Sequence, residues 1–301
     1  MSNLEATQLF SVKDRVVVIT GGGSGLGRIV AKALAINGAS KIFVLGRRED
    51  ALRETASQAG PKVIPVACDV TSKESLEAAY QAVAAQTSHV DILFANSGTL
   101  GSKVIPKPKV DGSLHSLSEI RDALLALPMK DFTNVLNVNV TGAYYTVVAF
   151  LPLLEAANQR RPVPRPGVLS PPTAQVIITS SIAAFNRNVP NNYAYNTSKA
   201  AVTHLVKSLS TNFLPYHIRV NGIAPGLYHT EMSDSMFKNI DVDGGIWDNS
   251  VPANLIPLTR SGSEEDFAGL FIWMASASGG YINGTIIVTD GGRLGSIPSA
   301  Y

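Results

Sequence analysis

Short apolar, β-branched runs recur along the chain and alternate with stretches of helical periodicity. The apolar runs predict seven strands, at Arg15–Thr20, Lys41–Leu45, Lys62–Ala67, Asp91–Ala95, Gln175–Ser180, His217–Ile223 and Thr285–Thr289. Apolar positions three and four apart predict helices at Leu26–Asn37, Asp50–Ala59, Thr71–Gln86, Lys130–Ala157, Tyr193–Leu214 and Glu264–Ala275. Strands that are apolar on both faces are typical of a buried parallel sheet.

Several of these helices carry their own boundary signals. Gly38 and Gly60 follow the first two helical stretches, where glycine commonly ends a helix. Thr71 and Glu74 have the spacing of a capping box at the start of the third. Pro152 lies inside the fourth and predicts a bend there.

The regular alternation predicts right-handed βαβ units in a Rossmann-like α/β fold, a doubly wound seven-stranded parallel sheet. Two stretches interrupt it: 99–117 is polar and contains Pro106 and Pro108, and 159–172 contains five prolines and three arginines. The alternation resumes directly after each stretch. Both therefore read as loop insertions, with the Arg160–Arg165 cluster solvated, and residues 1–301 are predicted to form a single domain.

Composition excludes several classes of protein. Hydrophobic residues make up 45% and charged residues 16% of 301, which suits a globular protein with a sizeable core. The net charge of +2 gives no reason to expect nucleic acid or an anionic membrane as a partner. The single cysteine, Cys68, excludes an internal disulfide and is expected to be packed and unreactive. Residues 1–15 do not resemble a signal peptide, and no apolar run approaches about 18 residues, so a cytoplasmic protein without a membrane span is expected.

A glycine-rich turn joins the first strand to the first helix. Gly21, Gly25 and Gly27 have the spacing G-x-x-x-G-x-G. Glycines permit a tight turn whose backbone N–H groups reach a pyrophosphate at a helix N-terminus. The turn is therefore predicted to bind a dinucleotide through Gly21, Gly23, Ser24, Gly25, Leu26 and Gly27.

The end of the second strand points to one form of the dinucleotide. Folds that bind NAD usually carry a carboxylate about twenty residues beyond the glycines, whereas this chain has Arg47 and Arg48. An arginine pairs with a 2′-phosphate through two hydrogen bonds. We expect NADP(H) in preference to NAD(H), bound through Arg47 with help from Arg48; an ordinary solvated pair is the alternative.

A tyrosine and a lysine share one face of the fifth predicted helix. Tyr195 and Lys199 are four residues apart, while the +4 position from Tyr193 is Thr197. A nearby ammonium stabilises a phenolate and eases proton exchange. Ser181 follows the fifth strand, whose carboxyl end should face the cofactor crevice.

Together these motifs resemble the short-chain dehydrogenase/reductase family, of the simple single-domain type. The resemblance extends over about Asp14–Gly292. Its motifs stand in the family's order, at Thr20–Gly27, Cys68–Val70, Ala95–Gly98, Asn139–Gly142, Thr179–Ile182, Tyr195–Lys199, Val220–Gly226, Thr230 and Asp290–Gly292.

The resemblance implies a catalytic role for four residues. Tyr195 would be the acid in reduction and the base in oxidation, and Lys199 would lower its pKa and hold the nicotinamide ribose. Ser181 would hydrogen-bond the substrate oxygen and stabilise developing charge. Asn139 would bind the water that links Lys199 to solvent.

The resemblance also implies cofactor contacts beyond the glycine-rich turn. Asp69 and Val70 would contact the adenine, by side chain and backbone respectively. Adenosine support would come from Asn96, with Ser97 and Gly98 beside it. The nicotinamide would be held by Pro225, Gly226, Tyr228 and Thr230, the last near the carboxamide.

Two departures from the family pattern stand out. Ser181 and Tyr195 are separated by one residue more than is common, which makes Ser180 a rival for the catalytic serine. Ser97 stands where alanine is usual, and a small residue in a turn should have little effect.

The function expected from these features is NADP(H)-dependent interconversion of a secondary alcohol and a ketone, as a ketoreductase on an apolar small molecule. The segment Leu227–Asp248 resembles the family's substrate-covering region. Side chains expected to line the substrate site, or alternatively to pack in a core or interface, are Phe185, Tyr193, Leu227, Tyr228, Met232, Met236, Phe237 and Trp247.

Alternatives from other classes are a nucleotide-binding regulator or cyclase without redox turnover, and a structural or interaction protein. Retention of Asn139, Ser181, Tyr195 and Lys199 favours the enzyme. No histidine pair has metal-ligand spacing, so no metal is expected; only His229 lies near the expected nicotinamide site. The family's habit implies a homodimer or homotetramer formed through Lys130–Ala157 and Tyr193–Leu214.

Overall fold

A computed structural model describes residues 4–102, 106, 109, 111–163, 165–166, 168–189, 192–237 and 246–301. Its strands are β1 (Val16–Thr20), β2 (Lys41–Gly46), β3 (Val63–Ala67), β4 (Ile92–Ala95), β5 (Gln175–Thr179), β6 (Arg219–Pro225) and β7 (Ile286–Thr289). They pair in parallel in the order β3-β2-β1-β4-β5-β6-β7. The predicted doubly wound seven-stranded sheet is confirmed.

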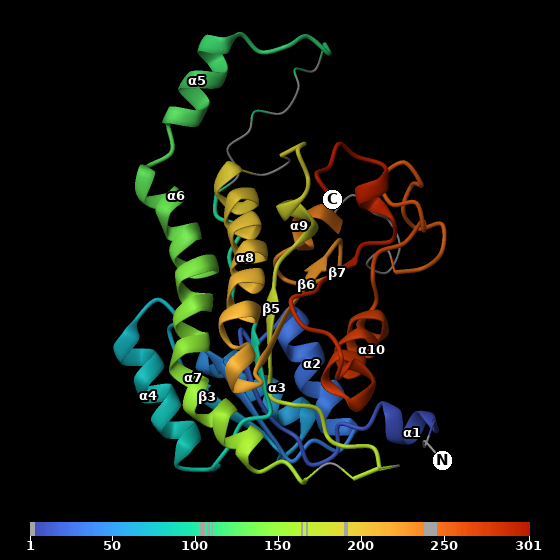
Figure 1. Ribbon diagram of the computed structural model, residues 1–301. Helices are drawn as coiled ribbons and strands as arrows, with labels where there is room; N and C mark the ends of the chain where they lie inside the picture. The colour runs from blue at the N-terminus through green and yellow to red at the C-terminus, as the bar shows by residue number, and fades with distance from the viewer. Residues whose placement is uncertain are drawn as a thin grey trace.

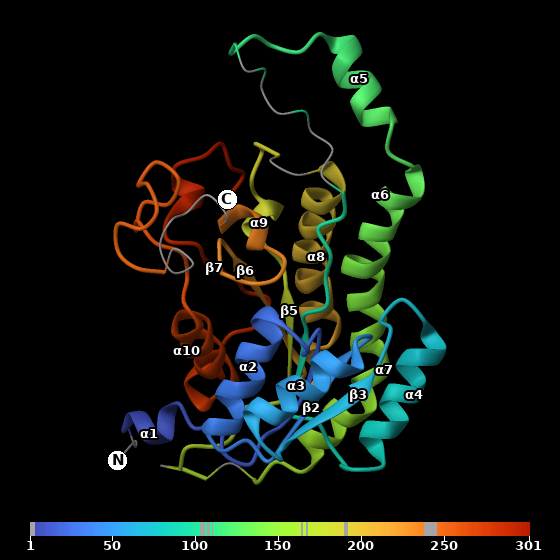
Figure 2. The same cartoon turned by 180° about the vertical axis from the view of Figure 1, so that it is seen from behind.

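Helices cover both faces of this sheet (Figures 1 and 2). The helices of the described chain are α1 (Ala6–Leu9), α2 (Gly25–Ile36), α3 (Glu49–Ala59), α4 (Lys73–Ala84), α5 (Leu117–Leu125), α6 (Met129–Leu136), α7 (Gly142–Gln159), α8 (Tyr193–Asn212), α9 (Asp234–Phe237) and α10 (Glu264–Ala275). Successive strand residues face opposite sides. Val18 and Leu93 pack in a core with α4, α7 and α8, while Val17 and Phe94 pack in a second core with α2 and α10.

The long predicted helix at Lys130–Ala157 is interrupted. α6 and α7 are joined by a π-helical turn, η1 (Asn137–Thr141), in which the Gly142 N–H bonds the Asn137 carbonyl five residues earlier. π turns are rare and concentrate at functional sites. The predicted helical segment at Lys130–Ala157 is confirmed, since α6, η1 and α7 are contiguous and Pro152 lies within α7; the π turn at Asn139 was not predicted.

Two predicted boundaries were also wrong. Ser72, not Thr71, caps α4, because the Ser72 hydroxyl accepts the Ser75 N–H. β6 begins at Arg219, not at His217, because His217 has a left-handed backbone with φ of 55°. In addition, α5 follows the 99–117 insertion and was not predicted; none of its residues is buried, and it projects from the body in Figures 1 and 2.

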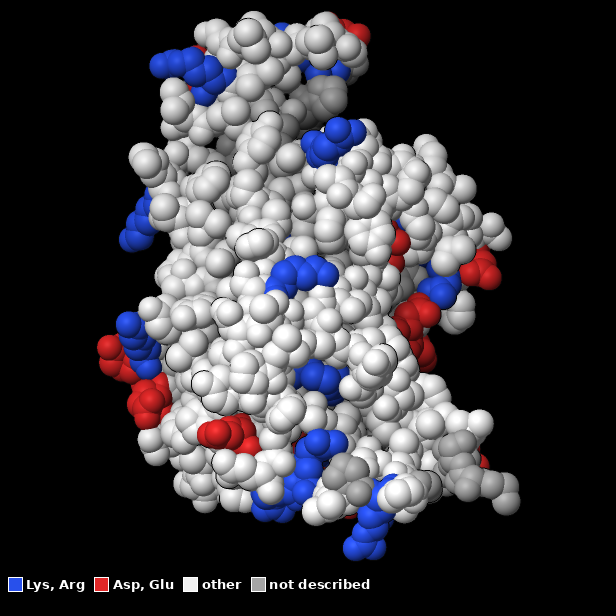
Figure 3. All heavy atoms as spheres, in the orientation of Figure 1, with Lys and Arg blue, Asp and Glu red and all other residues white. Residues whose placement is uncertain are grey.

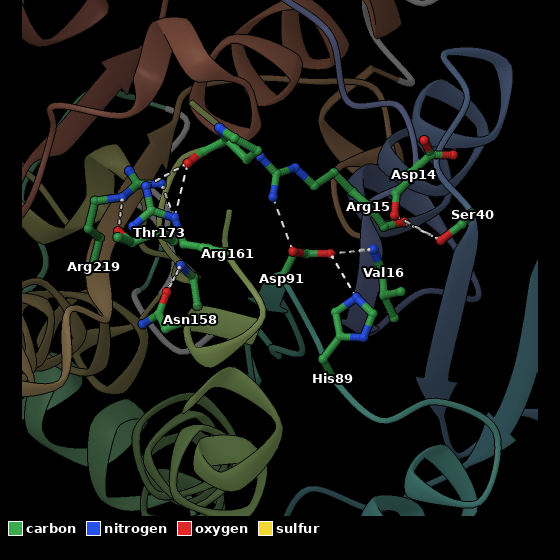
Figure 4. A network of polar contacts seen from close by, with 12 residues as sticks. Asp14, Arg15, Val16, Ser40, His89, Asp91, Asn158, Arg161, Thr173 and Arg219 are labelled. Carbon is green, nitrogen blue, oxygen red and sulfur yellow. Dashed lines mark hydrogen bonds and ion pairs between the residues drawn. The ribbon is translucent and has the colours of Figure 1, made fainter. Parts of the chain in front are cut away.

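Charged residues join the strands at their amino ends (Figure 4). The Asp91 carboxylate accepts the Val16 N–H at 2.8 Å and pairs with Arg15 at 3.1 Å. Nearby, Arg161 donates Nε and Nη2 to the Pro171 carbonyl, at 3.0 and 2.7 Å. Arg161 is therefore half-buried and bonded, which corrects the expectation that the whole Arg160–Arg165 cluster is solvated.

One described stretch, Met129–Gln159, is apolar and long enough to cross a membrane by length and composition, with a mean hydropathy of 1.4. Core helices of soluble proteins can be as long and as apolar, and 44% of the most apolar 18-residue stretch of this helix is buried within the fold. On the face shown in Figure 3, acidic and basic side chains are scattered among uncharged ones without a broad field of one sign.

Candidate active site

A cavity of about 810 Å³ lies beside the carboxyl ends of the central strands. The strand order reverses between β1 and β4, and a crevice at such a point is the usual ligand site of this fold. Of the predicted site residues, all line the cavity except Gly27 and Asn139. The structure thus gathers, at one edge of the sheet, residues that are more than 200 positions apart, as Gly21 and Thr230 illustrate.

The glycine-rich turn is close-packed against the start of α2. A Cβ on Gly27 would overlap the Gly21 carbonyl oxygen, so only glycine lets the helix approach its own turn. Gly25 has a φ of +49°, and a Cβ there would meet Thr230 at 3.1 Å. Gly27 therefore shapes the turn without lining the cavity, and the turn leaves the N-terminus of α2 open to an anion.

Asn96 ties three strand ends together. The Thr20 hydroxyl at the end of β1 accepts the N–H groups of Asn96 and Ser97, at 3.0 and 3.1 Å. The Asn96 side-chain oxygen accepts the Thr179 hydroxyl at the end of β5, at 2.9 Å. These bonds hold β1, β4 and β5 in register around the cavity, so Asn96 acts as a positioning residue.

The two arginines after β2 differ in their partners. Arg48 pairs with Glu231 at 2.7 Å and donates to the Ser24 hydroxyl at 3.1 Å. Arg47 makes neither an ion pair nor a side-chain hydrogen bond with any described residue, but its charge acts on Asp69. Bonds from the Thr71 N–H and hydroxyl lower the pKa of Asp69 and keep it ionised.

Tyr195 is set by the first turn of α8. The Asn192 side-chain oxygen caps this helix by accepting the Tyr195 N–H at 2.7 Å. The Asn192 amide also donates to the carbonyls of Leu100 and Ser102, at 2.6 and 2.9 Å. Asn192 thus joins the helix that carries Tyr195 to the loop after β4. Sequence reasoning missed it, although an asparagine directly before a helix is a common cap.

Ser181 and Ser180 point to different partners. The Ser180 hydroxyl bonds Thr203 at 2.7 Å and the Lys199 carbonyl at 3.2 Å, both on α8. The Ser181 side chain accepts the Ala183 N–H at 3.1 Å and lies close enough to Tyr195 to lower the pKa of its hydroxyl. Ser181 is therefore the serine placed beside the tyrosine, and Ser180 fastens β5 to α8.

Burial controls the ionisation of the Tyr195–Lys199 pair. Burial raises the pKa of the Tyr195 hydroxyl above its usual value, and the Ser181 hydrogen bond lowers it by less. Burial lowers the pKa of Lys199 to about 8. The Lys199 Nζ donates to the Thr179 carbonyl at 2.7 Å and lies 5.8 Å from the Tyr195 ring centre. Burial, with an opposing effect of Ser181, therefore sets the direction of the Tyr195 pKa shift in this structure.

Asn139 lies in the π turn, behind the cavity wall. Its amide donates to the Thr99 carbonyl at 3.0 Å and to the Ser198 hydroxyl at 2.9 Å, and its oxygen accepts the Thr99 N–H at 2.8 Å. A Cβ on Gly98 would lie 3.3 Å from the Asn139 oxygen and 3.6 Å from the Lys199 Nζ. The Asn139 side chain therefore holds this loop against Lys199.

The expected apolar lining is present only in part. Leu227, Tyr228 and Met232 line the cavity. Phe185 packs edge-to-face against Tyr301, and Phe237 is buried in a separate cluster with Leu227. Tyr193 and Trp247 are more than half exposed and lie outside the lining, as does Phe237. The side chain of Met236 and residues 238–245 of the expected covering segment are outside the described residues.

Three other sequence expectations concern single side chains. Cys68 is buried, and burial raises the pKa of its thiol to about 11, which confirms a packed, protonated cysteine. His229 pairs with Asp234 at 3.3 Å and does not line the cavity. Among the residues that the structure describes, no group of three or more His, Cys, Asp or Glu side chains is arranged to hold a metal.

Comparison with known proteins identifies the family of the chain. The sequence profile of the short chain dehydrogenase family matches residues 15–241. The chain is 38% identical to the short-chain dehydrogenase/reductase PhomF of Diaporthe leptostromiformis, over 99% of this chain and 98% of that protein.

Two solved structures show the same fold. The RhlG/NADP active-site complex of Pseudomonas aeruginosa has a TM-score of 0.74 at 28% identity, over 95% of this chain and 98% of that one. The 3-ketoacyl-(acyl-carrier-protein) reductase of Brucella melitensis complexed with NADH has a TM-score of 0.74 at 25% identity, over 95% and 100%.

Proposed function

Because the chain belongs to the short-chain dehydrogenase family and is an oxidoreductase, we propose that it interconverts a ketone and a secondary alcohol with NADP(H). One observation carries this proposal. Ser181, Tyr195 and Lys199 line the same cavity as the glycine-rich turn, and Ser181 lies close enough to Tyr195 to lower the pKa of its hydroxyl. A turn suited to a nucleotide and a residue suited to donate a proton therefore face the same cavity.

The residues present fit a dinucleotide. The turn before α2 leaves no room for side chains at Gly27, and the cavity of about 810 Å³ is large enough for an extended ligand. The glycine-rich turn would hold the diphosphate, and Pro225 and Thr230 the nicotinamide end. The bound nicotinamide would supply or accept the hydride.

Preference for NADP(H) rests on Arg47. Its exposed guanidinium is unpaired among the described residues, whereas Arg48 already pairs with Glu231. A guanidinium can take a 2′-phosphate through two hydrogen bonds, and no carboxylate occupies position 47. The known structures leave both nucleotides open, because one similar complex holds NADP and another NADH.

The side chains divide the proton chemistry between them. The raised pKa of Tyr195 keeps the phenol protonated near neutral pH, so it can donate to the carbonyl oxygen in reduction. Ser181 donates a hydrogen bond to the same oxygen and stabilises charge as it develops. Lys199, with a pKa of about 8, remains mostly charged at pH 7 and stabilises the phenolate that forms.

In this proposal, the backbone at Asn139, not its side chain, binds the water that links Lys199 to solvent. Both amide hydrogens of its side chain are donated to Thr99 and Ser198, and its side-chain oxygen accepts the Thr99 N–H, so the side chain is committed to the loop after β4 and to α8. A π turn, however, shifts backbone carbonyls out of ordinary helical pairing. We therefore assign the water contact to the backbone of the π turn, next to α8, which carries Lys199.

The test combines binding with turnover. NADPH and NADH are titrated by fluorescence, and a panel of ketones and quinones is then followed at the absorbance of the reduced cofactor. Tyr195→Phe should lower turnover by at least about a hundredfold and leave NADPH bound, because general acid catalysis contributes on that scale. Tyr193→Phe is the matched control, since Tyr193 is exposed and has Thr197 at +4.

Two outcomes would redirect the assignment. Full activity of Tyr195→Phe would contradict the mechanism. Tight NADPH binding without oxidation by any ketone in a broad panel would favour the non-redox nucleotide-binding alternative.

A further inference from the structure

Arg293 is a cationic side chain in the active-site cavity that the proposed chemistry does not use. It lines the cavity together with Ser181, Ala183 and Tyr195. It makes no ion pair and no side-chain hydrogen bond within the part of the chain that the structure describes, and its Nε is buried without a partner. It also lies one residue beyond Gly292, where the family motifs end.

The nearest carboxylate does not satisfy this guanidinium. The two oxygens of Asp290 accept the N–H groups of Gly292 and Leu294, at 2.9 and 2.8 Å. Asp290 thus caps the turn that carries Arg293, and its charge only partly offsets the burial that lowers the Arg293 pKa. Arg293 is partly buried, and its Nε is removed from water without a partner, which is costly; a ligand in the cavity would remove this cost.

The segment around Arg293 is fixed on both sides. Leu294 is buried, and residues 298–300 pair with residues 185–187 through the Arg187 N–H to the Pro298 carbonyl and the Ala300 N–H to the Phe185 carbonyl. Residues 185–187 directly follow the Ser181 turn. In Figure 1 the red end of the chain accordingly lies beside the end of β7 and near α9. Arg293 is therefore preorganised at the substrate end.

Contacts on the other side point to the same end of the cavity. A Cβ on Gly226 would lie 2.7 Å from Asp290, so the turn before Arg293 packs against Pro225–Gly226, the segment expected at the nicotinamide. The arginines suited to the cofactor's 2′-phosphate, Arg47 and Arg48, follow β2 instead. A free cation beside the reacting end suits the substrate better than the cofactor.

We infer that Arg293 binds a carboxylate of the ketone substrate, so that the substrate combines an apolar body with one anionic group. This inference rests on the proposed function and narrows its substrate class. Arginine binds a carboxylate through two parallel N–H···O bonds, which fixes orientation as well as affinity. With Leu227 and Met232 on the same wall, the cavity suits an amphiphilic keto acid.

The test measures binding without turnover. Two matched pairs of ketones are titrated into the protein by calorimetry, and in each pair one member carries a carboxylate and the other a carboxamide. One pair is aromatic, 4-acetylbenzoate and 4-acetylbenzamide, and the other is alkyl. The protein is titrated both saturated with NADP⁺, with which a ketone cannot react, and without nucleotide. The wild type should bind the carboxylates at least about tenfold more tightly, as expected for a charge-assisted hydrogen bond.

Variants assign that preference to one side chain. Arg293→Gln should abolish the carboxylate-to-carboxamide ratio, and Arg293→Lys should restore part of it. Arg187→Gln, which removes the same charge from an exposed neighbour outside the cavity lining, should keep the ratio. Carboxamide affinity in Arg293→Gln reports that the cavity is intact.

In the wild type, either no preference for the carboxylate or no measurable carboxylate binding would overturn the inference. In Arg293→Gln, an unchanged carboxylate-to-carboxamide ratio would overturn it, and so would a loss of NADP⁺ affinity without a change in that ratio. The last result would make Arg293 a ligand of the cofactor phosphates. A wild type that reduces neutral ketones but shows no preference contradicts only the role of Arg293, whereas failure to bind either nucleotide contradicts the proposed function.

Discussion

At the scale of single residues, adjacent residues of the same type have different bonding partners. Arg48 pairs with Glu231, while Arg47 beside it is left without a partner among the described side chains. The Ser180 hydroxyl bonds Thr203 and the Lys199 carbonyl, while Ser181 lies beside Tyr195. All four side chains line the cavity, and the change of backbone direction at each strand end gives the two neighbours different partners.

Arg47→Asp tests the cofactor preference. The new carboxylate should repel a 2′-phosphate, so NADPH affinity should fall by at least about tenfold while NADH affinity changes by less than about threefold. Fluorescence titration of both nucleotides measures the two constants. Arg53→Asp, at an exposed position on α3, controls for the change in net charge. Equal loss for both nucleotides would remove Arg47 from this role.

Separate alanine variants distinguish the two serines. Ser181→Ala should lower kcat/KM by about a hundredfold with little change in Tm, because a donor to the developing oxyanion is lost. Ser180→Ala should keep most activity and lose about 1 kcal/mol of stability, since the partly buried Thr203 hydroxyl loses a partner. Steady-state kinetics and thermal unfolding of both variants measure this, and the opposite pattern would make Ser180 the catalytic serine.

Lys199 predicts a pH dependence of stability. Its folded-state pKa of about 8 lies below the usual value of 10.5, so between these values the unfolded chain binds more protons and the free energy of unfolding rises with pH. Between pH 7 and 10.5, the free energy of unfolding of the wild type should rise by at most about 3 kcal/mol relative to that of Lys199→Met. The slope should not exceed about 1.4 kcal/mol per pH unit. Urea unfolding of both proteins across this range measures the difference. A constant difference would show that the lysine is not desolvated.

At the scale of elements, the start of α8 determines how the catalytic helix meets the loop after β4. The Asn192 oxygen caps the helix, while its amide holds Leu100 and Ser102. The π turn η1 packs against α8 from the other side, with Asn139 bonded to Ser198. Tyr195 and Lys199 are thus fixed by contacts with segments far away in the sequence.

Two variants separate the functions of Asn192. Asn192→Ala should cost about 1 kcal/mol for the lost cap and lower kcat as well, because the loop after β4 loses its anchor. Asn192→Asp keeps the acceptor for the Tyr195 N–H and removes both donors, so it should retain most stability but still lose activity. Chemical unfolding and kinetics of both variants provide the comparison. Full activity in Asn192→Asp would show that the loop contacts do not position the site.

At the scale of the whole molecule, the two cores leave apolar side chains on the outer helices. Phe132, Tyr144 and Val148 on α6 and α7, and Tyr193 on α8, are each between 37% and 52% exposed. The exposed apolar side chains of α6 and α7 adjoin those of α8, because α6 packs against α8. We propose that these helices join copies of the chain into a dimer or tetramer, and that residues 1–301 fold as one domain within it.

Sedimentation at micromolar concentration tests the assembly. The wild type should sediment as a dimer or tetramer, and Tyr144→Asp combined with Val148→Asp should shift it toward monomer, because a buried unpaired charge is costly. Ile36→Asp on α2, at an 82% exposed position on another face, should leave the assembly unchanged. A monomeric wild type would contradict the proposal.

Sequence by itself determined the order and type of the strands, the turn at Gly21–Gly27 and the Tyr195–Lys199 pair. These features depend on periodicity or on spacings of a few residues, so local sequence encodes them. Only the tertiary structure decided the π turn at Asn139, the contact of Ser180 with Thr203 and the placing of Arg293 in the cavity lining. Each depends on packing between segments distant in the chain, and such packing leaves no periodic signal in either segment.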